Sequence, residues 1–325
     1  MFETIKNAWN LIQNSIQVFN RHPKFLIPLL ITWLVYAPIT LYLEYGFNWR
    51  ALSVGQIFLF VFGIIFLFAF LLGFSCLILL ELIQQLESRK ELDLGKAFVN
   101  SLTGNILKFA PIVLVWTIVW FTLLILDVLV SIFFRETRER RGSLTLESAA
   151  KTLAGYGIFS LISSFFALLK RGARMIVFII APAIAWENLS FGKAIKRGFN
   201  VFTLHTPEFS TGFILTWVAA AIIFLPLTIL FWMSGVSEIT FPNWVWLLAI
   251  IYTAFAWSYS LYLEQMFIAQ LYLWHLKWEK QIEKEKRHGK QLSKLKDVKK
   301  PSLLDEIFEL SEIRNGQGPS LTKRP

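Results

Sequence analysis

The feature that most constrains this chain is an apolar run from Ile57 to Leu80 that contains no charged residue. About 20 residues of α-helix cross the roughly 30 Å hydrocarbon core of a bilayer, so this run predicts a membrane span. Its apolar side chains together contribute roughly −6 to −11 kcal/mol of insertion free energy. In the whole chain 55% of residues are hydrophobic and only 17% are charged. Because this leaves too little polar surface for a water-soluble body, we expect an integral membrane protein.

Four further segments have the length and polarity of a membrane span. They cover residues 25–43, 109–126, 213–233 and 244–263. Since each is long enough to cross as a helix, we expect an all-α membrane domain over residues 1–274.

A sixth segment, 156–186, contains the charged break Lys170-Arg171-Gly172-Ala173-Arg174. Three cations near the centre cost roughly 7 to 10 kcal/mol, against roughly −4 to −8 kcal/mol from the surrounding apolar side chains. One interpretation is a bent or interfacial element. We favour a long helix that crosses beside protein, with its charges turned away from lipid.

The distribution of basic residues predicts the orientation, because Lys and Arg gather in short cytoplasmic loops. It predicts six spans, both termini in the cytoplasm and a multi-pass protein of the cell (inner) membrane. The formal net charge of +10 fits such an asymmetry, and nucleic-acid binding is not expected from it. The gaps assigned to the cytoplasm contain Lys6, Arg21 and Lys24, then Arg89, Lys90, Lys96 and Lys108, then Lys193, Lys196 and Arg197.

One gap contradicts this topology. Residues 135–155 carry four arginines and Lys151, yet six spans place them outside the cell. In the alternative topology, 106–134 re-enters the membrane without crossing and the chain stays cytoplasmic up to Ser210. That alternative leaves four spans.

A short motif occurs at three places and marks helix starts. Glu91-Leu-Asp-Leu-Gly-Lys-Ala97 recurs as Asn188-Leu-Ser-Phe-Gly-Lys-Ala194 and, more loosely, as Ser143-Leu-Thr-Leu-Glu-Ser-Ala149. Asp93, Ser190 and Thr145 stand where a side-chain oxygen caps the following turn. We expect amphipathic interfacial helices that lead into spans, although chance similarity is the alternative. After the second copy the apolar face is Ala194, Ile195, Phe199 and Phe202, and the polar face is Lys193, Lys196, Arg197 and Asn200.

Two further stretches give the chain a family resemblance. They are Ala8-Trp9 to His22-Pro23, and Pro182-Ala-Ile-Ala-Trp-Glu187 followed by Ala194 and Phe199. Over residues 1–270 the chain resembles uncharacterised prokaryotic multi-pass membrane proteins, similar to the membrane domain attached to some glycerophosphodiester phosphodiesterases. The resemblance implies a helical bundle with amphipathic cytoplasmic connectors. It implies no activity, because that membrane domain is distinct from the hydrolase domain.

Catalytic motifs are scarce, so we predict no enzyme activity, no cofactor and no metal. The four histidines lack a metal-binding spacing, and the lone Cys76 lies in an apolar run. Ionisable residues at membrane depth are the main functional candidates, because an unpaired charge there is costly. Positions at the membrane interface are the alternative for the three acidic ones. The candidate intramembrane polar site comprises Asp127, Lys170, Arg171, Arg174, Glu187 and Glu264.

The tail, residues 275–325, is predicted to be a basic cytoplasmic unit. Its first part extends the last span as a charged helix and attracts anionic lipid headgroups. Beyond Pro301, a capping box at Ser302 opens a short amphipathic helix, so that 302–313 either docks on a protein partner or folds back. The candidate lipid-contacting residues are Lys277, Lys280, Lys284, Lys286, Arg287 and Lys290.

Two hypotheses for function follow. The first is a non-enzymatic protein that organises the cytoplasmic membrane face through anionic lipid and partner contacts. The second is a small transporter or channel, in which buried charged residues line a polar path. Cations of 170–174 at the surface favour the first hypothesis, and enclosed cations favour the second.

Overall fold

The computed structural model describes residues 2–88, 91–133, 145–154, 161–236, 240–288, 293–294, 297–298 and 303. Every regular element among these residues is helical, so the all-α prediction is confirmed. Five helical segments are long and apolar enough to cross a membrane. They are Pro23–Gly46, Val54–Glu87, Leu94–Val130, Thr206–Gly235 and Asn243–Arg287.

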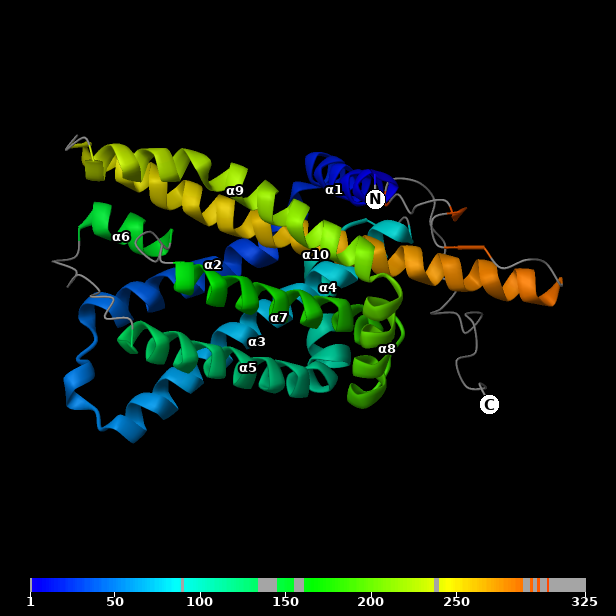
Figure 1. Cartoon of the computed structure of the whole chain (residues 1–325), viewed down its shortest axis with the longest axis horizontal. Helices are drawn as coiled ribbons and strands as arrows, with labels where there is room; N and C mark the ends of the chain where they lie inside the picture. Colours follow the sequence, from blue (N-terminus) through cyan, green and yellow to red (C-terminus); the bar gives the residue numbers. More distant parts are fainter. Residues whose placement is uncertain are drawn as a thin grey trace.

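Six long helices lie side by side in one bundle, and consecutive ones run in opposite directions (Figure 1). α10 is the central helix, since it packs against α2, α7 and α9 and is buried at every position from 261 to 276. α5 packs between α3 and α7. The six are α2 (Ile27–Leu41), α3 (Val54–Glu87), α5 (Ile106–Phe133), α7 (Leu161–Ala185), α9 (Thr206–Val236) and α10 (Asn243–Arg287).

Three connecting helices, α1 (Phe2–Arg21), α4 (Leu94–Asn100) and α8 (Phe191–Leu204), lie at one end of the bundle (Figure 1). Each leads into a long helix: α1 into α2, α4 into α5 and α8 into α9. Their buried faces pack on the bundle, as Ala8 and Leu11 do from α1. α1 and α8 are amphipathic, as predicted, and their position at the membrane interface stays a prediction.

A fourth connecting helix, α6 (Leu146–Leu153), lies at the opposite end of the bundle (Figure 1). The Tyr45 hydroxyl bonds the Thr152 hydroxyl at 2.8 Å, and Ser234 Oγ donates to Glu147 at 2.6 Å. Burial alone would raise the pKa of Glu147, but the bonds from Lys151 and Ser234 outweigh it and lower that pKa. Along the chain α6 stands between α5 and α7. Because α6 lies at the far end, α5 and α7 each run the length of the bundle. Residues 134–144 of the contradictory loop lie outside the described residues.

Two of the three predicted helix caps form. Asp93 accepts from the Lys96 N–H at 3.0 Å, which lowers the pKa of Asp93, and Thr145 accepts from the Ser148 N–H at 3.1 Å. The prediction for Ser190 is wrong in one respect, because Ser190 begins α8 without a side-chain bond. The turn before Ser190 differs from the turn before Asp93 in the first copy of the motif. Asn188 has φ 54°, a left-handed value that Asn tolerates.

The beginning of the tail belongs to the bundle. α10 runs without a break past position 274, so the expected boundary at 274/275 lies within a helix. Trp278 Nε1 donates to the Ser293 carbonyl at 2.9 Å and Trp274 Nε1 to the Val298 carbonyl at 3.0 Å. Leu303 is buried in the main core. The described tail residues thus fold back on α10, while the rest of 302–313 and Lys290 lie outside the described residues.

Candidate functional site

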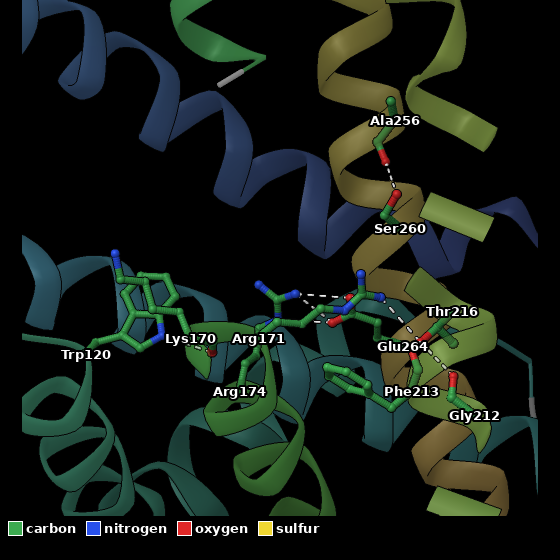
Figure 2. Close-up of polar contacts among 10 residues, drawn as sticks. All are labelled: Trp120, Lys170, Arg171, Arg174, Gly212, Phe213, Thr216, Ala256, Ser260 and Glu264. Atoms are coloured by element: carbon green, nitrogen blue, oxygen red, sulfur yellow. Dashed lines mark hydrogen bonds and ion pairs between the residues drawn. The ribbon is translucent and has the colours of Figure 1, made fainter. Parts of the chain in front are cut away.

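The charged break of the sequence lies near the middle of α7. Arg171 is ten residues after Leu161 and fourteen before Ala185, about 15 Å and 21 Å along the helix. Arg174 Nε and Nη2 each lie 3.0 Å from a different oxygen of Glu264 on α10. Arg171 Nη2 lies 2.6 Å from Glu264 Oε1 (Figure 2). One carboxylate thus holds both guanidinium groups.

Protein encloses this triad. The Glu264 side chain is only 2% exposed, and the side chains of Arg171 and Arg174 are 11% and 17% exposed. Arg171 also donates to the Thr216 hydroxyl of α9 at 3.3 Å, and its guanidinium carbon lies 5.6 Å from the centre of the Phe213 ring. Side chains of α7, α9 and α10 therefore cover most of the triad.

The third cation points to a different helix. Lys170 Nζ lies 3.3 Å from Asp127 Oδ2 on α5, and its backbone carbonyl accepts from Trp120 Nε1 at 3.2 Å. Asp127 Oδ1 is buried and has no hydrogen-bond partner among the described residues. With the triad, this cluster contains three cations and two carboxylates. One positive charge is therefore not balanced within the cluster.

Glu187 was expected to join this site, and the structure places it elsewhere. It lies thirteen residues after Arg174 and beyond the end of α7, so it belongs to the end of the bundle that carries α8. There it accepts from Arg197 Nε at 3.0 Å and from the Tyr272 hydroxyl. Arg197 also forms two bonds to Glu279, at 2.8 and 2.5 Å.

The position of Arg197 shows that the predicted polar face of α8 is wrong at this residue. The residue was expected on the polar outer face, but its side chain is only 9% exposed, because Glu187 and Glu279 both lie under α8. Phe199, expected on the apolar face of α8, is 62% exposed, so that face does not pack on the bundle at this position. Burial would lower the pKa of Arg197, but the bonds to its acidic partners outweigh burial and raise it.

Two histidines close to Glu279 were not recognised from the sequence as functional candidates. His205 Nε2 and His275 Nδ1 are 2.8 Å apart, and His275 Nε2 lies 3.3 Å from Glu279 Oε1. Burial, followed by repulsion from His275, lowers the pKa of His205 to about 3. In the part of the chain that the structure describes, no group of three or more His, Cys, Asp or Glu residues is arranged to hold a metal ion.

A cavity of about 330 Å³ adjoins the α7 cations. It lies between α2, α3, α5, α7 and α10, and its size is at the lower end of small-molecule sites. Most of its walls are aromatic or aliphatic, and Lys170 and Arg174 provide its cationic groups. The other lining residues are Thr32, Tyr36, Leu43, Trp49, Val61, Ile64, Ile65, Phe68, Ala69, Leu72, Trp116, Trp120, Leu124 and Trp257.

A larger cavity, of about 760 Å³, lies between the end of α3 and the start of α4. Its polar groups bond one another. Glu81 accepts from Asn100 Nδ2 at 2.6 Å, and Gln85 Oε1 accepts from the Asp93 N–H at 2.8 Å. These bonds stabilise the α3–α4 turn, so we assign this cavity a structural role.

The candidate lipid-contacting residues divide by exposure. Lys284, Lys286 and Arg287 are exposed near the end of α10, whereas Lys277 and Lys280 are half-buried. Arg287 Nη2 lies 2.7 Å from Glu283 Oε1 in an exposed ion pair. The end of α10 that carries the exposed cations extends from the side of the bundle where α1, α4 and α8 lie (Figure 1).

The resemblance to the membrane domain of some glycerophosphodiester phosphodiesterases rests on short motifs and stays a prediction. No family model matches the chain, and no curated protein or solved structure is significantly similar to it.

Proposed function

We propose that this chain is a small membrane transporter whose substrate is an anion held by the α7 cations inside the bundle. The observation that carries the proposal is the charge imbalance among Asp127, Lys170, Arg171, Arg174 and Glu264, all at most about a quarter exposed. A charge at the membrane centre costs roughly 2.5–3.5 kcal/mol or more. A bound anion would neutralise the cluster and remove much of that cost.

The proposal requires α7 to be a sixth membrane span. Its cations make it too polar for a span by composition alone, but Asp127 and Glu264 compensate two of its three charges. The position of α6 at the far end of the bundle supports full crossings by α5 and α7 (Figure 1). Six crossings would put both chain termini on one side. The excess of basic residues in α1, α4, α8 and the end of α10 favours the cytoplasm for that side.

Polar side chains recur on α10 between the cluster and the α8 end, although the amides of Gln265 and Gln270 donate to different helices, at the Cys76 carbonyl of α3 and at Ser15 Oγ of α1. Gln265 and Gln270 follow Glu264, and both amide oxygens are buried without a hydrogen-bond donor among the described residues. The His275–Glu279 pair comes next on the same helix. Buried polar groups with spare bonding capacity are unusual in a helix core, and they are more often functional than structural in a membrane protein.

The exposed cations support a second role, contact with anionic lipid. Lys193, Lys196, Lys284, Lys286 and Arg287 are exposed on α8 and α10. Each Lys or Arg near a membrane surface adds about 1 kcal/mol of attraction to anionic headgroups. This role is compatible with transport, because it involves a different surface. It retains the lipid-contact part of the organiser hypothesis, whereas the enclosed α7 cations favour the transporter.

Anion binding to the purified protein tests the proposal. The protein in phosphatidylcholine nanodiscs is titrated with chloride, acetate, inorganic phosphate and decanoate while its unfolding temperature is recorded. A ligand at 100 times its Kd stabilises by about 2.7 kcal/mol, so at least one anion should raise Tm saturably. Exchange of that anion across proteoliposomes should follow.

Two variants provide the comparison. Arg171→Gln leaves two cations against two carboxylates, so the excess positive charge is lost and the cluster becomes balanced. We expect it to lose the anion response, whereas Arg287→Gln, at the exposed pair with Glu283, should keep it. Absence of any saturable anion effect, or equal effects in both variants, would contradict the proposal.

A further inference from the structure

We infer that the anion is an amphiphile with one hydrocarbon tail, whose acidic group binds the α7 cations while its tail lies in the adjoining 330 Å³ cavity. The inference rests on the proposed function and adds the class of substrate. It follows from three observations: the walls of the cavity, the charge beside it, and an indole N–H that has no acceptor among the described residues.

The walls of the cavity suit a hydrocarbon chain. Four tryptophans and Phe68 contribute to them, together with aliphatic side chains from α3 and α5. Ligand sites of this kind are predominantly apolar with a few placed polar groups. A small hydrated anion would leave these walls without an apolar partner, so a substrate that lacks a tail uses only a fraction of the site.

The charge beside the cavity suits an acidic group. Lys170 and Arg174 line it, and both belong to the cluster with one unbalanced positive charge (Figure 2). Guanidinium and ammonium groups bind carboxylates and phosphates through charge-assisted hydrogen bonds. A neutral lipid would occupy the walls and leave that charge unbalanced, so the combination selects an anionic amphiphile.

Trp116 provides a further donor. It lines the cavity, its side chain is 2% exposed, and its Nε1 has no acceptor among the described residues. The neighbouring Trp120 is different, because its Nε1 already donates to the Lys170 carbonyl. A buried indole N–H usually finds an acceptor, and an oxygen of the acidic group would supply one.

Competition binding with tritiated palmitate in phosphatidylcholine nanodiscs tests the inference. The competitors separate charge from tail: unlabelled palmitate and hexadecyl phosphate have both, methyl palmitate has only the tail, and acetate and inorganic phosphate have only the charge. We expect saturable binding that the first two displace, with the other three weaker by about 100-fold or more.

The matched variants are Ala69→Phe and Ala221→Phe. Ala69 is buried and lines the cavity, so Phe there should weaken palmitate binding about tenfold or more. Ala221 is exposed on α9 and outside the cavity lining, so the same substitution there should leave the affinity unchanged.

A measurement that needs no variant uses dibromostearate, which should quench the fluorescence of Trp116, Trp120 and Trp257. Palmitate should reverse that quenching, and methyl palmitate should not.

The outcomes distinguish the two proposals. If acetate or inorganic phosphate competes as well as palmitate and Ala69→Phe binds normally, the amphiphile inference is wrong and the anion site stands. The amphiphile inference is also wrong, and the anion site again stands, if no saturable palmitate binding occurs while a small anion stabilises the protein. If methyl palmitate competes as well as palmitate and Arg171→Gln binds normally, charge does not matter and both proposals are wrong.

Discussion

Glu264 on α10 and Arg174 on α7, ninety residues apart, form a two-pronged ion pair in which each carboxylate oxygen lies 3.0 Å from a different guanidinium nitrogen. Nη2 lies closer still to the other oxygen, at 2.7 Å, and charge-assisted bonds of this kind are stronger than neutral ones. The ion pair gives α7, the one of the six long helices that is not a candidate span by length and composition, a compensating partner inside the bundle. The neighbouring Arg171 uses the same carboxylate.

Removing that carboxylate should destabilise the protein strongly. Glu264→Gln leaves two enclosed guanidinium groups without a counter-charge, and breaking a buried pair costs about 3–5 kcal/mol. We expect a large fall in Tm in detergent and poor recovery from membranes. Glu264→Gln combined with Arg171→Gln and Arg174→Gln removes all three charges and should recover much of the loss.

Glu283→Gln is the matched control, because Glu283 also lies on α10 and also pairs with an arginine. That pair is exposed, with Arg287 74% and Glu283 42% accessible, so its loss should change stability by about 1 kcal/mol or less. Similar Tm values for Glu264→Gln and Glu283→Gln would show that the triad is not enclosed.

The packing of α9 on α10 should also make the stability of the protein sensitive to substitution of Gly212. A Cβ atom there would lie 1.9 Å from the ring of the fully buried Phe267. Gly212→Ala therefore overpacks the interface and should cost about 1–3 kcal/mol or more, measured as a fall in Tm. Adding Phe267→Leu should restore part of the loss.

Gly63→Ala tests the same substitution on a helix where nothing lies within 4 Å of the new Cβ. Ala is favoured over Gly in a helix by about 0.5–1 kcal/mol, so this variant should match or exceed the wild type. If both glycine variants behave alike, close packing at Gly212 is contradicted.

Acidification should weaken the α8 end through His205. Its pKa is about 3 in the folded protein against 6.5 as its ordinary value, so between those values the unfolded chain binds the additional proton. Stability from this residue is therefore complete above pH 6.5 and falls as the pH decreases, by up to about 2 kcal/mol at pH 5. Tm recorded from pH 7.5 to 5 should decrease.

His205→Gln keeps a polar neighbour for His275 and removes the titrating group. Its Tm should change less over the same pH range than that of the wild type. An equal or steeper decrease in the variant would assign the pH dependence to another residue.

The positions of the long apolar helices were predictable because their apolar runs are a matter of local composition. The uncharged run 57–80 lies entirely within α3, and 213–233 lies within α9. Helix starts were predictable for the same local reason, since Asp93 and Thr145 cap the turn that follows each of them.

The pairing of charges was not predictable, because it depends on the register of helices far apart in sequence. The sequence pointed to Glu264, Arg171 and Arg174 as candidates, but the packing of α7 on α10 brings them together. The same dependence explains the misplacement of Glu187 and Arg197. His205 and His275 are seventy residues apart, and no local pattern indicates that they touch.

The measurement that tests the central claim most directly is thiol accessibility at residue 145. In a Cys76→Ser background, single cysteines replace Thr145 at the start of α6, Gly235 at the end of α9 and Asn200 on α8. Intact cells are labelled with a membrane-impermeant maleimide. If α7 crosses the membrane with its cations enclosed, positions 145 and 235 are labelled from outside and position 200 only after permeabilisation. Labelling of position 145 only after permeabilisation would put α6 in the cytoplasm and contradict the enclosed anion site.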